Sequence, residues 1–392
     1  MKQGWEYKRL REIGNIVTGS TPSTKDETNY SPREYCFVKP SDLPSQGIAL
    51  IEETEYYVSS KGLSKSRVLP TGSVLVSCIG SIGKIGILTK EACSNQQINA
   101  IIPKNDIDSK FIAYSIYAYR FLLESIANAP VVPIINKTDF SKIQIPLPPK
   151  FTQLSIVSEL DKINELIRLK QEQLKDYDNL AQSIFYEMFG DPVENEKGWE
   201  VKELGQLCEV TSSKRVFINE VVDAGVPFIR GTELTALNKL VPGEKMHYTL
   251  FITQEHYERL KAITGVPKVG DLLIPSINAD GIVWMVDTEE PLYFKDGRVL
   301  WIHVNHNHFN SIAIQKLMNI LIKNIYASMG GATFAELKLF VLRNMKVPIP
   351  PLSVQDAFAE KIKRIDIQKL QVKKSITDLE TLLASRMQYW FE

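Results

Sequence analysis

The sequence predicts an α+β protein with two mixed α/β domains and a long antiparallel two-helix coiled coil, arranged as a pseudo-two-fold tandem repeat. Three observations support this prediction. The chain has 392 residues, too many for one ordinary core. Its two halves resemble each other, and each half ends in a long heptad-patterned stretch. Short Val- and Ile-rich runs between Gly, Pro, Ser and Asn clusters predict strands early in each half, and residues 109–127 predict helix.

Four segments recur in the same order along the chain, which predicts a duplication. The pairs are GWEYKRLREIGNIVTG (from Gly4) with GWEVKELGQLCEVTSS (from Gly198), FVKPSDL (37–43) with FIRGTEL (228–234), TGSVLVSCIGSIGKIGIL (71–88) with VGDLLIPSINADGIVWMV (269–286), and IPLPP (145–149) with VPIPP (347–351). Any one of these pairs could arise by chance. Four pairs in the same order over the full length indicate a repeat whose insertions fall in the connections.

Each half ends in a stretch whose apolar positions step alternately by four and three residues, which is typical of a coiled-coil seam. The first seam runs from Ile156 to Met188 and the second from Phe358 to Trp390. Gly190 and the nearby proline predict the end of the first helix. A helix pair about 50 Å long is favoured. The alternative is two separate amphipathic helices, each packed on its own domain.

The two proline-rich segments stand at the roots of these helices. Proline fixes φ and restrains the preceding residue to extended geometry, so we expect rigid struts that aim each helix away from its domain. The first helix then carries the chain away from the first domain, and the second helix returns. The predicted organisation is a domain at 1–150, a spacer helix at 151–190, a second domain at 191–350 and a second spacer helix at 351–392.

Composition indicates a globular protein, with 44% hydrophobic and 23% charged residues. No apolar run approaches the roughly 20 residues that span a bilayer, and the polar N-terminus is unlike a signal peptide. We therefore expect a cytoplasmic protein without a membrane partner. The net charge is zero, although residues 1–150 carry 18 Lys and Arg against 14 Asp and Glu. Any nucleic acid would have to bind at local basic patches.

The order of several motifs resembles the specificity (S, HsdS) subunit of type I restriction-modification systems. The motifs are GWE, then SIGKIGIL followed by NQQINAIIP, then IPLPP followed by ELDKI, then FYEMFGDPVENEKGWE. The match covers essentially the whole chain, and MFGDP beside a heptad helix with the duplicated proline segment is its most specific part. The resemblance implies that each domain is a target recognition domain that reads one half of a split, asymmetric DNA site, and that the helix pair sets the spacer.

The resemblance also implies partners and cofactors. It implies binding to double-stranded DNA, to two methyltransferase (M) subunits docked on the helices, and to restriction (R) subunits. S-adenosylmethionine, Mg²⁺ and ATP are expected on those partners and none on this chain. The sequence lacks an NPPY-like motif, a Walker motif and the common hydrolase motifs, so we interpret the chain as non-catalytic. The alternative function is a coiled-coil protein-interaction scaffold that does not bind DNA.

The glycine-rich stretch at 77–86 offers a first candidate DNA contact. One interpretation is a β-turn whose glycines allow φ > 0. The other is a phosphate contact through backbone N–H groups, Ser81 and Lys84. The Walker spacing is absent. The second copy of this stretch has no lysine, but Asn278 is a candidate for a base-edge contact.

Two further pairs of equivalent positions carry candidate DNA-binding residues. Gln96 and Gln97 can read adenine bidentately or bond the backbone at a strand end, and their counterpart Arg298 can pair with guanine. Lys39 and Arg230 occupy matching positions, and each has an acidic residue three positions later. An internal ion pair and a DNA contact are both open for these two cations.

A basic loop in the first half completes the predicted DNA contacts. Lys61, Lys65 and Arg67 lie among small residues, and the equivalent stretch of the second half carries Arg259 and Lys261. A solvated charged loop and a patch that neutralises the DNA backbone are both open. The slight basic excess of the first half favours the patch.

The helices carry candidate partner-binding positions near the middle of the seams. These are Lys170, Leu174, Tyr177, Lys369, Val372 and Ile376. Charged interruptions of the seam, including Arg386, are typical of residues that set register or dock a partner. No metal site is expected, because the histidines of HVNHNH (303–308) lack further ligands and an equivalent in the other half. None of the four cysteines forms a C-x-x-C pair, which disfavours a zinc or redox motif.

Overall fold

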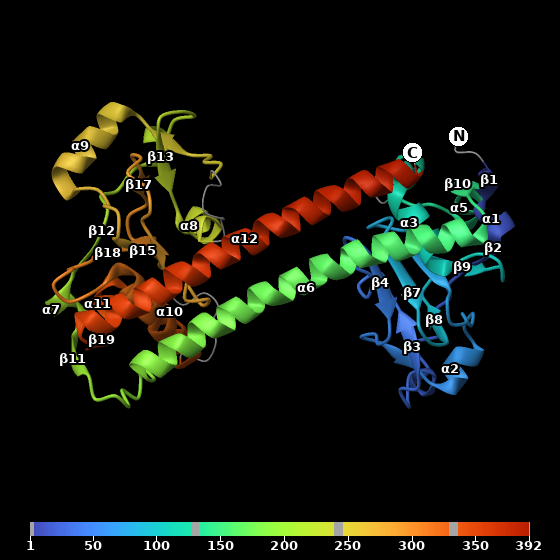
Figure 1. The fold of residues 1–392 in the computed structure, drawn as a ribbon, viewed down its shortest axis with the longest axis horizontal. Coiled ribbons are helices and arrows are strands. Elements are labelled where there is room, and N and C mark those ends of the chain that lie inside the picture. The colour runs from blue at the N-terminus through green and yellow to red at the C-terminus, as the bar shows by residue number, and fades with distance from the viewer. Residues whose placement is uncertain (1–3, 128–132, 239–245, 329–335, 392) are drawn as a thin grey trace. The chain divides into compact units, whose positions relative to one another are not determined.

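The computed structural model describes residues 4–127, 133–238, 246–328 and 336–391. These residues fall into two compact units: unit 1 comprises 1–169 and 377–392, and unit 2 comprises 170–376. Two long helices, α6 (Lys150–Phe189) and α12 (Leu352–Phe391), each contribute one part to either unit (Figure 1). The division of the chain into four parts that we made from the sequence stays a prediction.

Unit 1 is built on two sheets. The larger, in the order β2-β9-β6-β7-β4, comprises β2 (Gly14–Thr18), β9 (Ile98–Pro103), β6 (Val74–Ser77), β7 (Ile85–Leu88) and β4 (Ile48–Ile51). The smaller, in the order β5-β3-β8, comprises β5 (Tyr57–Val58), β3 (Tyr35–Val38) and β8 (Ala92–Ser94). The shorter helices are α1 (Leu10–Ile13), η1 (Glu27–Asn29), α2 (Ser60–Ser64), α3 (Ser109–Ala118), α4 (Arg120–Ile126) and α5 (Lys137–Lys142). Every side chain of β6 and β7 is buried, so these strands lie at the centre of the unit.

Unit 2 repeats this plan. Its larger sheet, in the order β12-β18-β15-β16, comprises β12 (Glu209–Ser212), β18 (Val299–His303), β15 (Leu272–Pro275) and β16 (Trp284–Met285). Its smaller sheet, in the order β14-β13-β17, comprises β14 (Phe251–Ile252), β13 (Val226–Ile229) and β17 (Tyr293–Phe294). The shorter helices are α7 (Leu204–Leu207), η2 (Ile218–Glu220), α8 (Gly231–Leu237), α9 (Gln254–Thr264), α10 (Ser311–Ser328) and α11 (Leu339–Arg343). No helix in the described ranges combines the length and apolar character needed to cross a membrane.

Strand pairing confirms the predicted repeat. In unit 1, β1 (Glu6–Arg9) pairs antiparallel with β10 (Gln144–Leu147), and in unit 2, β11 (Glu200–Glu203) pairs in the same direction with β19 (Lys346–Ile349). In both pairs the first residue of one strand lies opposite the last residue of the other. β3 pairs in parallel with β8, and β13 pairs in parallel with β17. The two halves therefore share the direction and register of these pairs, while β4 of unit 1 has no counterpart among the described residues of unit 2.

We expected the proline-rich segments to be rigid struts, and part of each segment is in fact a paired β-strand. Pro146 lies in β10 opposite Tyr7, and Pro348 lies in β19 opposite Val201. Each belongs to a two-stranded ribbon, where a residue without an N–H is tolerated. The first part of each segment is thus tied to the first strand of its own half, and only the prolines after it lead into the helix.

A buried glutamine, whose role we did not predict from the sequence, completes this attachment. Gln153 Nε2 donates to the carbonyl of Pro148 at 2.9 Å, and its Oε1 accepts from the N–H of Asp108 at 3.0 Å. Gln355 makes the two equivalent hydrogen bonds in unit 2. Both side chains are buried. The amide therefore joins the proline segment, the start of the long helix and the N-cap of the helix that covers the sheet.

The long helices contact each other in the antiparallel sense that we predicted. In unit 1, the guanidinium of Arg386 on α12 donates to both carboxylate oxygens of Glu159 on α6. In unit 2, the rings of Phe185 and Phe189 on α6 pack on Phe358 of α12, with centroid separations of 5.7 and 5.0 Å. The start of each helix thus contacts the end of the other. The first helix ends at Phe189, followed by a glycine with φ of +74°, as the sequence indicated.

The core-facing positions shift by one residue at the end of each helix. The buried residues there are Phe185, Phe189, Met387 and Phe391, whereas the strict seam pointed to Ile184, Met188, Arg386 and Trp390. A straight α-helix has 3.6 residues per turn, so a pattern based on 3.5 drifts by about 20° per heptad. These helix ends also pack into the core of a unit as well as against the other helix, so the core decides which side chains are buried.

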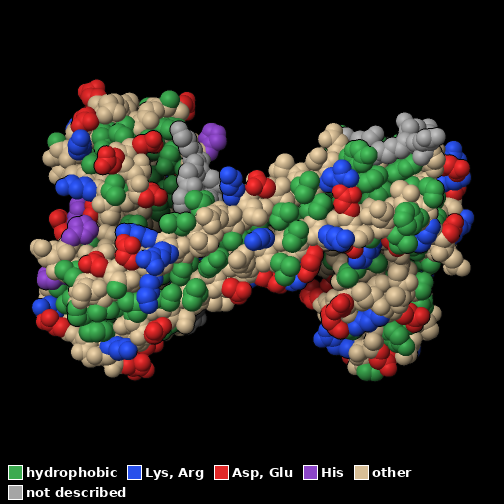
Figure 2. All heavy atoms as spheres, viewed as in Figure 1, with side chains coloured by type: hydrophobic (Ala, Val, Ile, Leu, Met, Phe, Trp, Pro, Cys, Tyr) green, Lys and Arg blue, Asp and Glu red, His purple; other side chains and the backbone are tan. Residues whose placement is uncertain are grey.

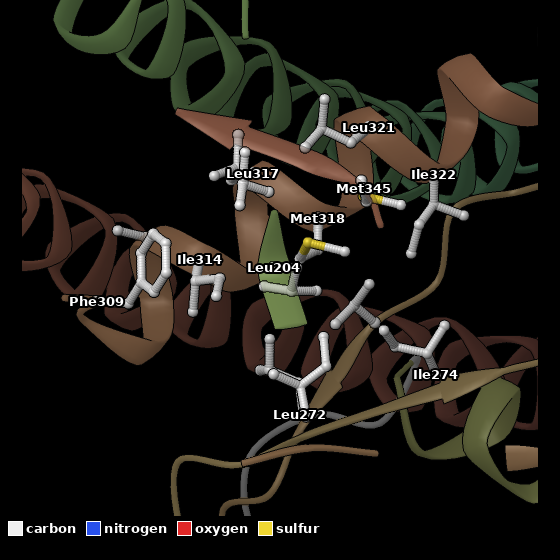
Figure 3. Close-up of a cluster of buried hydrophobic side chains, with 14 of the residues drawn as sticks. Leu204, Leu272, Ile274, Phe309, Ile314, Leu317, Met318, Leu321, Ile322 and Met345 are labelled. Atoms are coloured by element: carbon white, nitrogen blue, oxygen red, sulfur yellow. The ribbon is translucent and has the colours of Figure 1, made fainter. Parts of the chain in front are cut away.

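The core of unit 2 lies between helix α10 and the larger sheet of the unit. Figure 3 shows Leu317 and Met318 of α10, Leu204 of α7 and Leu272 of β15 directed into one cluster of buried side chains. The same cluster includes the aromatic side chains at the end of α6. The helix pair is therefore part of the hydrophobic core of unit 2 and is held by it.

Candidate nucleic-acid interface

Hydrogen bonds of the main chain place two polar side chains, half-buried Gln97 and exposed Arg298, at equivalent positions in the two units. The carbonyl of Gln97 accepts from the N–H of Cys78 at 2.8 Å, and the carbonyl of Arg298 accepts from the N–H of Ser276 at 2.9 Å. Each residue directly precedes a long strand of the larger sheet, β9 in unit 1 and β18 in unit 2. The backbone at these positions is fixed by the sheet.

Two more positions correspond in the same way. The N–H of Asn95 donates to the carbonyl that ends β3 at 3.1 Å, and the N–H of Lys295 donates to the carbonyl that ends β13 at 2.9 Å. In unit 2, three cations, Arg230, Lys295 and Arg298, line one open pocket of about 460 Å³ together with Thr232 and Ser276. We did not single out Lys295 from the sequence, because its role depends on this pairing of strands.

The matching cations Lys39 and Arg230 are anchored differently. Arg230 Nη2 lies 2.5 Å from the carboxylate of Glu233, so the ion-pair interpretation describes unit 2. Burial alone would raise the pKa of Glu233, but hydrogen bonds from Arg230 and its neighbours lower that pKa to about 2. In unit 1, the acid three residues on, Asp42, accepts from the N–H of Lys39, whose Nζ lies 3.0 Å from the ring centroid of Tyr56. DNA contacts by these cations stay predictions.

The turn between β6 and β7 has the glycine-dependent geometry that we considered. Gly80 and Gly83 have φ of +76° and +77°. Lys84 Nζ donates to the carbonyl of Pro40 at 3.1 Å, while Ser81 is exposed. We did not single out Arg120, although a Cβ on Gly83 would lie 2.8 Å from its side chain. This turn therefore carries a second cation beside the lysine. The phosphate contact that we predicted for the turn stays a prediction.

Asn278 holds the equivalent turn of unit 2 together. Its Nδ2 donates to the carbonyl of Ile282 at 2.7 Å, and its Oδ1 accepts from the N–H of the same residue at 2.6 Å. The side chain is buried, and the N–H of Asn278 donates to the hydroxyl of Tyr326. Burial of this amide, which already uses one donor and one acceptor within the turn, disfavours a base contact. Lys323 lies against Gly281 and supplies a cation that this turn otherwise lacks.

The basic loop of unit 1 gathers around one carboxylate. Lys61 Nζ and Lys65 Nζ each lie 3.1 Å from Asp26, which caps η1, and Arg67 donates to the carbonyl of Thr18 at 2.7 Å. A hydrogen bond from the Thr28 hydroxyl and the two lysines hold the pKa of Asp26 well below its usual range. The carboxylate is therefore ionised at neutral pH and competes with any phosphate for the lysines.

Replacing Asp26 by asparagine should strengthen DNA binding if these lysines contact phosphates. Asparagine also caps helices, so the local fold should persist. We expect an affinity gain of up to about fivefold at low salt and a steeper dependence on salt, by about one unit per newly engaged phosphate. Fluorescence anisotropy over a salt series measures both quantities. The matched control is Glu53→Gln, which frees Lys90 in the same unit. An unchanged or weaker affinity for Asp26→Asn would argue for a merely solvated loop.

The remaining predicted DNA residues are exposed and lie outside the cationic pocket of unit 2. Arg259 and Lys261 project from α9 and lie 3.6 and 3.7 Å from Glu220 and Glu258, respectively. Gln96 Oε1 accepts from the hydroxyl of Thr21 at 2.7 Å. Figure 2 shows both signs of charge interspersed over the visible face of the molecule. This mixture of signs fits the zero net charge of the chain.

Two of the three charged interruptions of the helical seam, Lys369 and Arg386, act across the helix pair. Lys369 of α12 lies 2.5 Å from Asp178 of α6, and Arg386 binds Glu159. Hydrogen bonds from Arg386 hold the pKa of Glu159 below its usual value. Lys170 bonds within its own helix. Of the other predicted docking positions, Val372 is buried, and those half-buried are Leu174, Tyr177 and Ile376. These contacts support the register interpretation, while docking stays a prediction.

The histidine-rich segment is connected to the core of unit 2. His303 Nδ1 lies 3.3 Å from Asp271, which also accepts from Trp301 Nε1 at 3.0 Å. Burial works against ionisation of Asp271, but hydrogen bonds from His303, Lys268 and Trp301 hold its pKa below its usual value. Within the ranges that the structure describes, no group of three or more His, Cys, Asp or Glu side chains could hold a metal ion.

Comparison with known proteins identifies similar sequences. A family model described as the type I restriction modification DNA specificity domain matches residues 2–176 and 196–381. The type I restriction enzyme MjaIX specificity subunit of Methanocaldococcus jannaschii is 24% identical over 412 residues, covering 96% of this chain and 90% of that protein. The MjaVIII specificity subunit of the same organism is 25% identical over 427 residues, covering 97% and 92%.

Two solved structures share the fold. The crystal structure of the S subunit of a type I restriction-modification system from M. genitalium has a TM-score of 0.55 at 15% identity, covering 99% of this chain and 96% of that one. A chain from a study of complex assembly and conformational transition of the type I R-M system has a TM-score of 0.62 at 15% identity, covering 99% and 97%. These likenesses extend over both units and both long helices.

Proposed function

The chain belongs to the type I restriction modification DNA specificity family, and from this we propose how it recognises DNA. It is a non-catalytic specificity subunit. In the proposal, the globular part of each unit is a target recognition domain that reads one half of a bipartite, asymmetric site. The helix pair sets the spacer between the half-sites and docks two methyltransferase subunits. Restriction subunits join the same assembly.

One observation carries this proposal: the scaffold is duplicated, but polar side chains at equivalent positions differ, buried or half-buried in unit 1 and exposed in unit 2. Gln97 and Asn95 in unit 1 correspond to Arg298 and Lys295 in unit 2. The strands that the two units have in common share their order and direction, while β4 of unit 1 has no counterpart among the described residues of unit 2. A repeated scaffold with diverged polar side chains suits two half-sites of different sequence, because sequence is read by side chains at base edges.

The surface of the helix pair supports the docking of partner subunits. Several large apolar side chains project from α6 and α12 into solvent in this chain. These are Leu166, Leu169, Leu180, Ile367 and Leu382, with exposed fractions between 45% and 56%. Apolar side chains of this size repeated along helices are suited to pack against helices of another subunit. We propose that the methyltransferase subunits cover them.

The chemistry of the complex belongs to the partners in this proposal. S-adenosylmethionine is bound by the methyltransferase subunits, and Mg²⁺ and ATP are used by partner subunits. In this proposal the chain positions its partner subunits: it brings them to one DNA sequence and fixes their orientation on the DNA. The complex acts on double-stranded DNA, so we propose that it works in the cytoplasm.

Exchange of residues 1–150 for the equivalent block of another family member tests this function. We expect the methylated motif to change in one half and to keep the other half and the spacer, because each unit has its own core. Methylome sequencing of a host carrying the methyltransferase with either version reads the motif directly, and a host without the gene is the control. A change in both halves contradicts modular recognition. A motif that persists without the gene contradicts the function itself.

A further inference from the structure

We propose that Arg298 and Gln97 are base-reading residues, Arg298 for a guanine in the half-site of unit 2 and Gln97 for an adenine in the half-site of unit 1. This inference rests on the proposed function and adds to it the residues and the bases. It separates side chains that position the DNA from side chains that discriminate between sequences.

The backbone at both positions is held rigidly. The carbonyls of Gln97 and Arg298 accept hydrogen bonds at 2.8 and 2.9 Å from the neighbouring chain segment. The strands that follow, β9 and β18, are each paired on both sides within the larger sheet. Discrimination between bases needs a donor and an acceptor placed within a fraction of an ångström, and paired strands provide this better than loops.

The amide of Gln97 is oriented by its neighbour. The N–H of Gln97 donates to Asn95 Oδ1 at 3.1 Å. This bond shows which atom of the Asn95 side chain is the oxygen, so the other atom is the nitrogen Nδ2. Asn95 Nδ2 then donates to Gln97 Oε1 at 2.8 Å. The bond from Asn95 shows which atom of the Gln97 side chain is the oxygen. Nε2 of Gln97 is then a donor, and Oε1 keeps a second lone pair that can accept another hydrogen bond. Adenine requires this pair of groups for a bidentate contact at N7 and N6.

The guanidinium of Arg298 is oriented by a carboxylate. Arg298 Nη1 lies 3.4 Å from Glu336 Oε1, and the side chain of Arg298 is 53% exposed. This contact engages one N–H of the fork, so the guanidinium can present two other parallel donors. Guanine accepts two such donors at O6 and N7. Arg298 lines the same pocket as Lys295 and Arg230, where Arg230 can neutralise a phosphate next to that guanine.

The pattern of shared and diverged residues assigns the roles. Lys39 and Arg230 are both cations at one equivalent position, and a phosphate contact is the same whatever the sequence. Gln97 and Arg298 differ at another equivalent position, where the carbonyl of each accepts the corresponding main-chain hydrogen bond. Positions that keep their chemistry suit contacts to the DNA backbone, whereas positions that change their chemistry suit base contacts in half-sites that differ.

Binding of the full chain, in complex with its methyltransferase subunits, to a panel of duplexes tests the proposal. The motif is first read by methylome sequencing, and each base pair of both half-sites is then replaced in turn. For the wild type, replacement of the guanine in the half-site of unit 2 should weaken binding by about tenfold to a hundredfold. Arg298→Gln should weaken binding to the native duplex by a similar factor and become insensitive to that one position. Gln97→Ala should do the same at one adenine of the other half-site.

A matched control and a second variant keep the test decisive. Arg215→Gln removes an exposed arginine of unit 2 that does not line the pocket, and it should keep the wild-type profile. Arg298→Lys retains the charge but not the bidentate fork, so it should keep the salt dependence while losing discrimination. If Arg298→Gln lowers affinity equally for every duplex, or leaves the profile unchanged, the proposal is wrong. Failure of the proposed function looks different, because the wild type itself would then show no preference among duplexes.

Discussion

Replacing Phe358 by alanine should destabilise unit 2 by about 3–5 kcal/mol. Its ring is fully buried and packs on Phe185 and Phe189 with centroid separations of 5.7 and 5.0 Å. The three rings join the two long helices and the core of the unit, so the neighbours are held from several sides and cannot collapse into the space left behind. The loss should therefore combine the lost burial with the cost of a cavity.

Hydrogen exchange resolved along the sequence measures this effect unit by unit. Amides in the core strands of unit 2 should lose protection in Phe358→Ala, because they exchange through unfolding of the unit. The control is Ile367→Ala on the same helix, whose side chain is 56% exposed and whose change should stay within about 0.5 kcal/mol. Equal protection in the two variants would mean that the aromatic cluster contributes little.

Local patterns explain why the architecture could be predicted from the sequence. The heptad spacing is a property of residues near one another, and the recurrence of four segments is visible when the two halves of the sequence are compared; they indicated the helix pair and the duplicated domains. The one-residue shift at the helix ends could not be predicted, because Phe185 and Met387 are selected by the cores that they enter. The same holds for Gln153, whose two partners come from different elements of the fold.

The candidate site was harder to predict, because polar side chains take partners that are distant in sequence. Asn278 has the right amide for a base contact, yet its turn uses both ends of that amide. Lys61 and Lys65 form the expected basic loop, yet both meet Asp26, which is more than thirty residues away. The sequence indicates which residue types are present. The strand pairing decides which of them face the same pocket.

Inserting one heptad into each long helix should lengthen the spacer of the methylated motif while leaving both half-sites unchanged. Seven residues add about 10.5 Å to a helix, and one base pair rises about 3.4 Å, so the gain is at most about three base pairs. The insertions belong after Leu169 in α6 and after Ile376 in α12, where the chain passes between units. Placed there, they keep the Asp178–Lys369 and Glu159–Arg386 pairs in register.

A heptad inserted into α6 alone is the matched comparison. It lengthens one helix against an unchanged partner, so the pairs on one side of the insertion lose their register, and the specificity of methylation should fall. Methylome sequencing distinguishes the two variants from each other and from the wild type. An unchanged spacer in the double insertion, with methylation retained, would mean that the helices join the two units without setting the distance. A longer spacer with the same two half-sites would mean that the helices set the distance between the half-sites and that the globular parts of the two units read their sequences.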